Sequence, residues 1–328
     1  MVAEKYLCII SFSLFLLASC DTDKQNVVKG NLLSEGNTAH RETPISVVDD
    51  LGREVTLGSP AKRIVALAPH IVENLFSAEL GGRVVAAVDY SDYPSEALDI
   101  PRVGGYADFS IETILSFKPD LVVGWASGYK GFTQLQDKLE ALNIALFVDE
   151  PTDLRSITYS VERFARLGGT WDTNATGNSA SSSVVRQRVE KFLDREKVLR
   201  DKYKEVLHRP KVFYQIWHDP LQTLGGEHIV SSLIELCGGQ SIFSDSLLIA
   251  PQVNVESIID RDPGLIVFTA EDEQVNAVNL FWEQWPTISA VDQQYIFRVN
   301  SDWLSRHTLR MMNGVDQLCD FIKIARRT

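Results

Sequence analysis

The chain contains one short sequence pattern twice, in two distant places. Residues 112–123 read E-T-I-L-S-F-K-P-D-L-V-V, and residues 256–267 read E-S-I-I-D-R-D-P-G-L-I-V. Each copy begins with Glu, continues as an apolar helical turn, breaks at a Pro at the same offset and ends in an apolar run. A helix that stops before Pro and leads into such a run is one step of a parallel α/β sheet. Because long-range repeats indicate duplicated structural units, we predict two related α/β lobes.

Length and charge narrow the possible functions. The chain has 328 residues, which is long for one core and suits two lobes of ordinary size. Its net charge of −12 disfavours a nucleic-acid partner, because phosphate binding needs a basic surface. No run of about 18 apolar residues follows the N-terminal segment, so we expect no membrane span in the body of the protein.

The N-terminal segment indicates export. Leu7–Ala18 is an apolar stretch of signal-peptide length that follows Lys5 and runs into Cys20. The tetrapeptide Leu-Ala-Ser-Cys resembles a bacterial lipobox, in which the Cys becomes the lipidated first residue of the mature protein. We therefore predict a signal peptide over residues 1–19 and a lipid anchor on Cys20. The alternative is an ordinary secretory signal with an incidental Cys.

Export bears on the tether and on the remaining cysteines. Residues 20–43 are polar and lack periodicity, which predicts a flexible tether. Asp21, by resemblance to lipoprotein sorting in enterobacteria, favours the inner membrane, so we expect a periplasmic protein anchored there. In that oxidising compartment a disulfide between Cys237 and Cys319 is the default expectation. Two buried free thiols are the alternative.

Strand and helix patterns alternate through both predicted lobes, which indicates parallel sheets covered on both faces. We predict a first lobe over residues 44–169, a loop and linking helix over 170–209, and a second lobe over 210–328. The first lobe opens with a hairpin near residues 46–57. Strands are expected at 64–68, 84–89, 121–125, 145–148, 212–216, 265–269 and 296–299, and helices at 72–80, 111–117, 132–142, 154–167, 229–236, 255–260, 275–285 and 304–325.

One long helical pattern lies between the lobes. Apolar residues recur at steps of three and four from Val185 to Val206, with charged residues between them, until Pro210 ends the pattern. A packed surface helix or a coiled-coil arm would show the same pattern. Its place between two α/β repeats favours a single helix that joins the lobes.

Aromatic and polar residues follow the predicted strands at the edge where parallel sheets bind ligands. Aromatic faces provide contact area at little entropic cost, so they suit a large, flat, partly apolar ligand between the lobes. A single aromatic residue at a strand end is more often a cap on the core. The residues at these strand ends are His70, Tyr90, Trp125, Trp217, His218, Asp302, Trp303 and Arg306.

Signatures of catalysis and of metal binding are missing from the sequence. It has no G-x-S-x-G elbow, no P-loop and no G-x-G-x-x-G after a strand, so we expect no enzyme, no catalytic residue and no cofactor. His70, His218 and His307 lack metal-ligand spacing, and we expect no metal site. Asp302 and Arg306 are also spaced for a simple i,i+4 ion pair.

A set of motifs stands at Tyr90–Pro94, Val103–Tyr106, Glu112–Trp125, Cys237–Gly239, Pro251–Glu256, Ser301–Trp303 with Arg306, and Gln317–Cys319. These motifs resemble those of the vitamin B12-binding proteins of periplasmic ABC importers, and the resemblance runs from about Arg63 to Phe321. The Tyr-Ser-Asp-Tyr-Pro and Ser-Asp-Trp…Arg runs are the more specific ones, whereas the helix–strand repeat is shared with haem and siderophore binders. This chain departs from the pattern at two positions: relatives often carry an aromatic residue where it has Ala250, and a Trp is common where it has Tyr106.

The resemblance implies two α/β lobes joined by a long helix, a Cys237–Cys319 bridge and a monomer that carries a corrinoid such as cobalamin. It implies that Glu112 and Glu256, one per lobe, dock into arginine pockets of the two-fold transporter subunits. Trp217 is our own suggestion for the space left by the departures. The residues that the resemblance assigns to the ligand are Tyr90, Tyr106, Trp125, Asp302, Trp303, Leu304, Ser305 and Arg306.

Each assignment has a competitor. Glu112 and Glu256 follow Ser110 and Asn254, so a favourable place near the positive end of a helix explains both carboxylates without docking. A haem or ferric-siderophore binder would have the same fold, with Tyr90, Tyr106 or His70 able to reach the iron. An envelope enzyme or metallochaperone is a more distant alternative.

Overall fold

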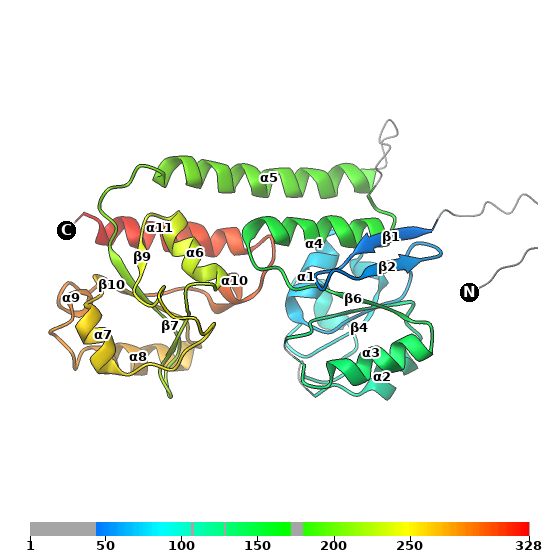
Figure 1. Ribbon diagram of the computed structural model, residues 1–328, viewed down its shortest axis with the longest axis horizontal. Coiled ribbons are helices and arrows are strands. Elements are labelled where there is room, and N and C mark those ends of the chain that lie inside the picture. Colours follow the sequence, from blue (N-terminus) through cyan, green and yellow to red (C-terminus); the bar gives the residue numbers. More distant parts are fainter. Residues whose placement is uncertain (1–43, 106–107, 128, 172–179, 328) are drawn as a thin grey trace, which may run out of the picture. The chain divides into compact units, whose positions relative to one another are not determined.

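A computed structural model describes residues 44–105, 108–127, 129–171 and 180–327 as two α/β lobes (Figure 1). The predicted signal peptide, tether, Cys20 and Tyr106 lie outside the described residues. The chain enters as an antiparallel hairpin of β1 (Ile45–Val48) and β2 (Glu54–Leu57). Asp49 stabilises its turn by accepting hydrogen bonds from the backbone N–H groups of Leu51 and Arg53.

The first lobe is a parallel sheet in the order β4-β3-β5-β6, with helices on both faces. Side chains of β3 alternate between the faces: Ile64 and Ala66 pack against α1 and α4, whereas Val65 packs against α2 and α3. The elements are β3 (Ile64–Ala66), α1 (Pro69–Ser77), β4 (Val84–Ala87), α2 (Ile111–Ser116), β5 (Leu121–Gly124), α3 (Phe132–Ala141), β6 (Ala145–Val148) and α4 (Leu154–Leu167).

The second lobe repeats this arrangement around β11-β10-β7-β8, with β10 parallel to both β7 and β11. On β7, Val212 and Tyr214 face α6 and α11, whereas Phe213 faces α7 and α8. The elements are β7 (Lys211–Trp217), β8 (Gln222–Thr223), α6 (Ile229–Leu236), β9 (Gln240–Ser241), α7 (Val255–Arg261), β10 (Leu265–Phe268), α8 (Val275–Trp282), α9 (Ser289–Asp292), β11 (Ile296–Arg298), α10 (Ser301–Ser305) and α11 (Met311–Ala325).

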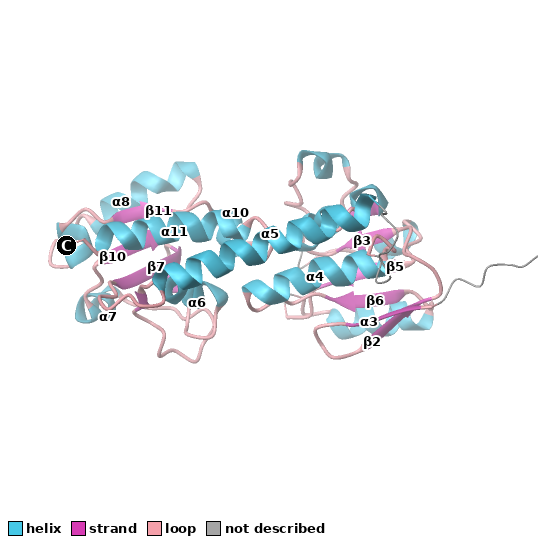
Figure 2. Ribbon diagram, turned by 90° about the horizontal axis from the view of Figure 1, so that it is seen from above, coloured by secondary structure: helices cyan, strands magenta, loops and turns pink. Residues whose placement is uncertain are grey.

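Two helices contribute side chains to both cores. The long helix α5 (Ala180–Tyr203) lies along α4 and also contacts α6 and α11 (Figures 1 and 2). Its Val189 packs in the first lobe, and its Phe192 and Leu199 pack in the second. Helix α4 does the same, because Phe164 belongs to the first core and Leu154 to the second. The predicted α/β fold with two parallel-sheet lobes is confirmed, and both helices couple the lobes.

The prediction of one helix over residues 304–325 is wrong. The structure has α10 and α11 with a break between them, and the backbone of Arg306 is extended. At the break, Thr308 accepts a hydrogen bond from the backbone N–H of Arg310 through its hydroxyl group. The apolar periodicity continues across the break, so the sequence pattern alone does not reveal it.

Cys237, at the end of α6, and Cys319, in α11, form a disulfide, as predicted. Both cysteines are buried, so the bond lies inside the second core. In the part of the chain that the structure describes, no helix is both long enough and apolar enough to span a bilayer.

Candidate functional site

A cavity of about 730 Å³ lies where the carboxyl ends of β7, β10 and β11 meet residue Tyr90 of the first lobe. This is the edge at which parallel α/β sheets bind ligands. Apolar and aromatic side chains form much of the wall, which favours a large, partly apolar ligand. The wall consists of Tyr90, Tyr214, Ile216, Trp217, His218, Asp219, Leu224, His228, Val230, Thr269, Ala270, Glu271, Gln274, Ala277, Val278, Ser301, Leu304 and Ser305.

Tyr90 and Trp217 are the large exposed aromatic residues of this wall. Tyr90 follows β4 with a φ of 62°, a left-handed conformation that is unfavourable for a bulky residue, and its side chain is 76% exposed. Trp217 ends β7, is 55% exposed and donates its indole N–H to the carbonyl of Asp219 at 2.9 Å. Strained backbone and exposed aromatic area concentrate at ligand sites, so Tyr90 and Trp217 make this cavity the candidate site.

The structure places some of the predicted ligand residues in the wall and others outside it. Tyr90, Trp217, Leu304 and Ser305 line the cavity together. Trp125 packs against the first core, with its ring edge-on to His70 at 6.1 Å between centroids. Asp302, Trp303 and Arg306 are absent from the wall.

Arg306 instead connects the two lobes. Its guanidinium lies 3.1 Å from the carboxylate of Glu73, which is almost fully buried in α1, and 2.6 Å from that of Asp92. It also forms the i,i+4 pair with Asp302 at 3.1 Å. Partial burial opposes the ionised form of Asp92, but the hydrogen bond and the charge of Arg306 hold the pKa of that carboxyl below its ordinary value.

Further polar contacts extend this connection, which we call the lobe seam: Glu73, Asn74, Asp92 and Pro151 of the first lobe with Arg306, His307 and Arg310 of the second. Arg310 donates to both carboxylate oxygens of Glu73, at 2.8 and 2.5 Å. The amide of Asn74 donates to the carbonyl of His307 at 3.0 Å, and Nδ1 of His307 donates to the carbonyl of Pro151 at 2.7 Å.

Three histidine rings lead from the first core to the cavity wall. The ring of His307 lies 6.5 Å from that of His70 and 6.2 Å from that of His228. Burial and the neighbouring His307 lower the pKa of His70 to about 3 and that of His228 to about 4. Burial also lowers the pKa of His307 itself. All three rings are therefore neutral at neutral pH.

The charges of the wall have one sign. Asp219 and Glu271 contribute carboxylates, and no lysine or arginine is among the described residues that form the wall. Arg306, close in sequence to the wall residues Leu304 and Ser305, is already paired with Glu73, Asp92 and Asp302. The cavity therefore disfavours an anionic group and accepts a neutral or cationic one.

Several wall residues escaped the sequence analysis. Thr269 and Glu271 directly follow β10, so the strand-end rule that found Tyr90 and Trp217 applies to them equally. His228 is the N-cap residue of α6, and the sequence alone does not separate such a cap from a residue of the cavity wall. Tyr214 lies inside a buried strand, and nothing in the sequence separates it from a core residue.

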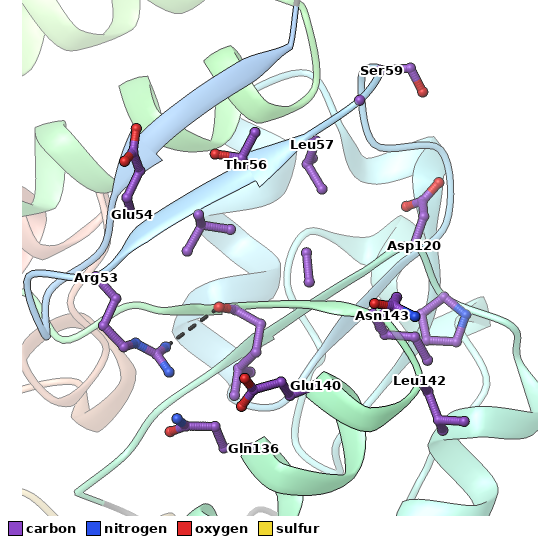
Figure 3. A pocket seen from close by; sticks show the side chains of 16 residues that line it. Arg53, Glu54, Thr56, Leu57, Ser59, Asp120, Gln136, Glu140, Leu142 and Asn143 are labelled. Carbon is purple, nitrogen blue, oxygen red and sulfur yellow. Dashed lines mark hydrogen bonds between the residues drawn. The ribbon is translucent and has the colours of Figure 1, made fainter. Parts of the chain in front are cut away.

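A second, larger groove of about 850 Å³ lies between the hairpin and the edge strand β6 (Figure 3). It is located at the amino ends of β5 and β6, opposite the edge at which such sheets bind ligands. Two of its charged groups are already engaged: Asp120 accepts the backbone N–H groups of Lys62 and Arg63, and Arg53 donates to the carbonyl of Leu146. We therefore regard the aromatic cavity as the functional site.

Comparison with known proteins fits this geometry. Residues 64–302, more than half of the chain, match the family described as periplasmic binding protein. The chain belongs to this periplasmic binding protein family. Membership places it among binding components of transport rather than enzymes.

The relatives of this periplasmic binding protein include vitamin B12-binding proteins. It is 34% identical over 270 residues to the vitamin B12-binding protein of Vibrio cholerae, covering 82% of this chain and 91% of the relative. The crystal structure of the periplasmic vitamin B12 binding protein BtuF of Vibrio cholerae matches with a TM-score of 0.71 at 32% identity, covering 82% of this chain and 99% of that one.

The same fold also occurs in a haem binder. The periplasmic heme-binding protein RhuT from Roseiflexus matches with a TM-score of 0.66 at 20% identity, over 81% of this chain and 99% of that one. Since folds host many ligands, the choice of ligand has to come from the cavity itself.

Proposed function

We propose that this protein is the substrate-binding component of an ABC importer and that it carries cobalamin or a related corrinoid. The observation that supports the proposal is the aromatic cavity with carboxylates and no cationic side chain in its described wall. A corrinoid offers a broad apolar ring, which suits Tyr90 and Trp217, and an edge of neutral carboxamides, which suits the polar residues. The vitamin B12-binding relatives support the same ligand.

A haem or ferric-siderophore ligand is the second candidate, because the fold is shared with a haem binder. Haem carries two propionates, and many ferric siderophores are anionic. Both would place negative charge near Asp219 and Glu271 without a lysine or arginine in the described wall to compensate it. Cobalamin carries a single phosphodiester, whose negative charge is offset by the positive charge of its cobalt–corrin core, so the electrostatics of the cavity favour the corrinoid.

Calorimetric titration of the purified protein with cyanocobalamin and with haem tests the choice. We expect saturable one-to-one binding of cyanocobalamin and at least tenfold weaker binding of haem. Trp217→Ala should weaken cyanocobalamin binding, whereas Tyr159→Ala, which removes an exposed aromatic of α4 outside the wall, should not. Tight haem binding with no response to cyanocobalamin would reverse the assignment.

The anchor and the docking residues complete the proposal. Lipidation of Cys20 would hold the protein at the inner membrane, and Cys20→Ala should move it from the membrane fraction to the soluble periplasmic fraction. Glu112 and Glu256 would contact the transporter. Each Glu is exposed in the first turn of its helix. The N-cap residues of these helices are Ser110 and Asn254, and the side chain of each accepts a hydrogen bond from a backbone N–H of the first turn.

A further inference from the structure

Two histidines, His218 and His228, line the cavity wall, and internal hydrogen bonds determine which ring nitrogen of each carries the proton. His228 caps α6: its Nδ1 accepts the backbone N–H of Val230 at 3.1 Å. An accepting nitrogen carries no proton, and burial beside His307 lowers the pKa of His228 to about 4. The ring is therefore neutral at neutral pH with its proton on Nε2.

The buried side-chain amide of Gln215 determines in the same way which ring nitrogen of His218 carries the proton. Trp282, fully buried in α8, donates its indole N–H to Oε1 of Gln215 at 2.8 Å, which fixes the orientation of that amide. The Nε2 amide group of Gln215 can only donate, and it lies 3.4 Å from Nδ1 of His218. Nδ1 of His218 is thus the acceptor, and its Nε2 carries the proton.

These hydrogen-bond roles argue against metal binding by either ring. A neutral imidazole has a single nitrogen with a free lone pair, and a histidine binds a metal through that nitrogen. In both rings the lone pair is already used by an internal hydrogen bond. Binding cobalt or iron through Nε2 would require the loss of the helix cap in one ring and of the Gln215 contact in the other.

The same hydrogen-bond roles favour recognition of a carboxamide group. The Nε2–H groups are donors suited to carbonyl oxygens, and the carboxylates of Asp219 and Glu271 are acceptors suited to N–H groups. A primary carboxamide presents both partners at once. A carboxylate of the same shape lacks the N–H groups and adds a negative charge beside Asp219 and Glu271.

We propose that the cavity recognises the carboxamide edge of its ligand through Nε2–H of His218 and His228 and through the carboxylates of Asp219 and Glu271, and that neither histidine ligates the metal. The proposal rests on the corrinoid function above and deepens it. It defines the accepted class as fully amidated corrinoids that keep their own axial groups, and the rejected class as corrinoids with free carboxylates.

The first experiment compares cyanocobalamin with its monocarboxylates, in each of which one peripheral carboxamide has been hydrolysed, by calorimetry at neutral pH. We expect at least one monocarboxylate to bind at least tenfold more weakly, because it brings a negative charge beside Asp219 and Glu271 and lacks the N–H groups that these carboxylates would accept. Asp219→Asn with Glu271→Gln should remove most of that difference. Equal affinity of all monocarboxylates and cyanocobalamin would overturn the carboxamide recognition.

The second experiment uses aquacobalamin, whose water on cobalt exchanges readily for imidazole and changes the visible spectrum when it does. We expect the spectrum of the bound form to remain that of the aqua complex. A spectrum of imidazole coordination that disappears in His218→Ala or His228→Ala would overturn the assignment of both rings as donors.

Variants of His218 and His228 distinguish hydrogen-bond donation by their rings from packing of the rings against the ligand. His228→Ala and His218→Ala should weaken cyanocobalamin binding severalfold, and Gln at either position, which keeps an N–H near the place of Nε2, should restore part of the loss. His208→Ala is the matched control, since His208 is exposed and outside the wall. Failure of every corrinoid to bind would overturn the corrinoid function and this inference together, whereas tight cyanocobalamin binding with no effect of these variants would overturn the inference alone.

Discussion

At the scale of single residues, the most unusual pair is Asp149 and His70. Asp149 follows β6 and His70 is in the first turn of α1; Asp149 is fully buried and the side chain of His70 is 14% exposed. Nε2 of the imidazole lies 3.7 Å from Oδ2 of the carboxyl group. Burial raises the pKa of Asp149 to about 7 and, with the nearby His307, lowers the pKa of His70 to about 3. Folding therefore favours the uncharged form of both residues.

Asp149→Asn should stabilise the protein increasingly as the pH rises. The folded-state pKa of Asp149 lies above its ordinary value of 3.8, so its contribution to stability is fully present below about pH 4 and is lost as the pH rises through 7. Asn does not ionise, and the variant should gain on the order of 3 kcal/mol over the wild type between about pH 5 and pH 8.

Urea unfolding of both proteins at these pH values measures that difference. His70 has the opposite dependence, because its lowered pKa costs stability as the pH falls from 6.5 towards 3. The comparison between the two proteins cancels the contribution of His70. A stability difference that does not change with pH would contradict the uncharged, buried state of Asp149.

The rule that ligands bind at the carboxyl ends of parallel strands predicted part of the cavity wall but none of the contacts of the lobe seam. Tyr90 and Trp217 were predictable because each follows a strand that the sequence marks clearly. The pair of Arg306 and Glu73 was not, since the two residues are 233 positions apart and meet only through the placement of two lobes. The sequence suggested an i,i+4 partner for Arg306, and that pair with Asp302 exists alongside the distant one.

At the scale of elements, apolar periodicity located most helices and the main strands to within a few residues. It failed where other forces decide. The break between α10 and α11 follows from the contacts of Arg306 and Arg310 across the seam, which periodicity does not record. The two-residue strands β8 and β9 are too short to show a period of their own.

The disulfide is the strongest single link between two of these elements. It closes a loop with a sequence separation of 82 between α6 and α11, and both sulfurs are buried in the second core. Replacing Cys237 and Cys319 together by Ala should lower the free energy of unfolding by about 2–5 kcal/mol, mainly because the unfolded chain gains freedom.

Denaturant unfolding of the double variant and of the wild type, with and without a reductant, checks this. The reductant should destabilise the wild type and leave the double variant unchanged. A variant as stable as the oxidised wild type would show that core packing alone holds α6 to α11. Cyanocobalamin affinity at a temperature where both proteins are folded serves as the control for an intact site.

At the scale of the whole molecule, the lobe seam and the two bridging helices determine how the lobes are held. Glu73 is 3% exposed and accepts hydrogen bonds from two guanidinium groups of the other lobe. Glu73→Gln removes the carboxylate that pairs with Arg310 and one of the three that pair with Arg306, and it should lower stability by about 2–4 kcal/mol. The distance between the lobes should also become more variable.

Spin labels at Leu98 and Leu280, two exposed positions on different lobes, measure that variability by pulsed dipolar spectroscopy. We expect a broader distance distribution in Glu73→Gln than in the wild type. Asp245→Asn is the control, because Asp245 and Arg261 form an exposed pair within the second lobe. An unchanged distribution would mean that α4 and α5 suffice to fix the lobes and that the seam contributes only stability.

Variants of the repeated Glu test whether ligand binding and delivery to a transporter depend on different residues. Glu112 and Glu256 are far from the cavity wall in sequence and absent from it, and each occupies the first turn of a helix in its own lobe. Near the helix dipole each carboxylate contributes only about 0.3–1 kcal/mol, so the double Ala variant should fold and bind cyanocobalamin normally.

If the two carboxylates dock to a two-fold membrane partner, that same variant should abolish corrinoid uptake, because each lobe loses its contact with one transporter subunit. Uptake of labelled cyanocobalamin by cells that depend on this protein measures the loss, and Glu140→Ala, an exposed acid of α3, is the control. Normal uptake by the double variant would reduce both residues to helix-end charges. Weakened binding by the double variant would instead tie them to the cavity, which their position in the structure argues against.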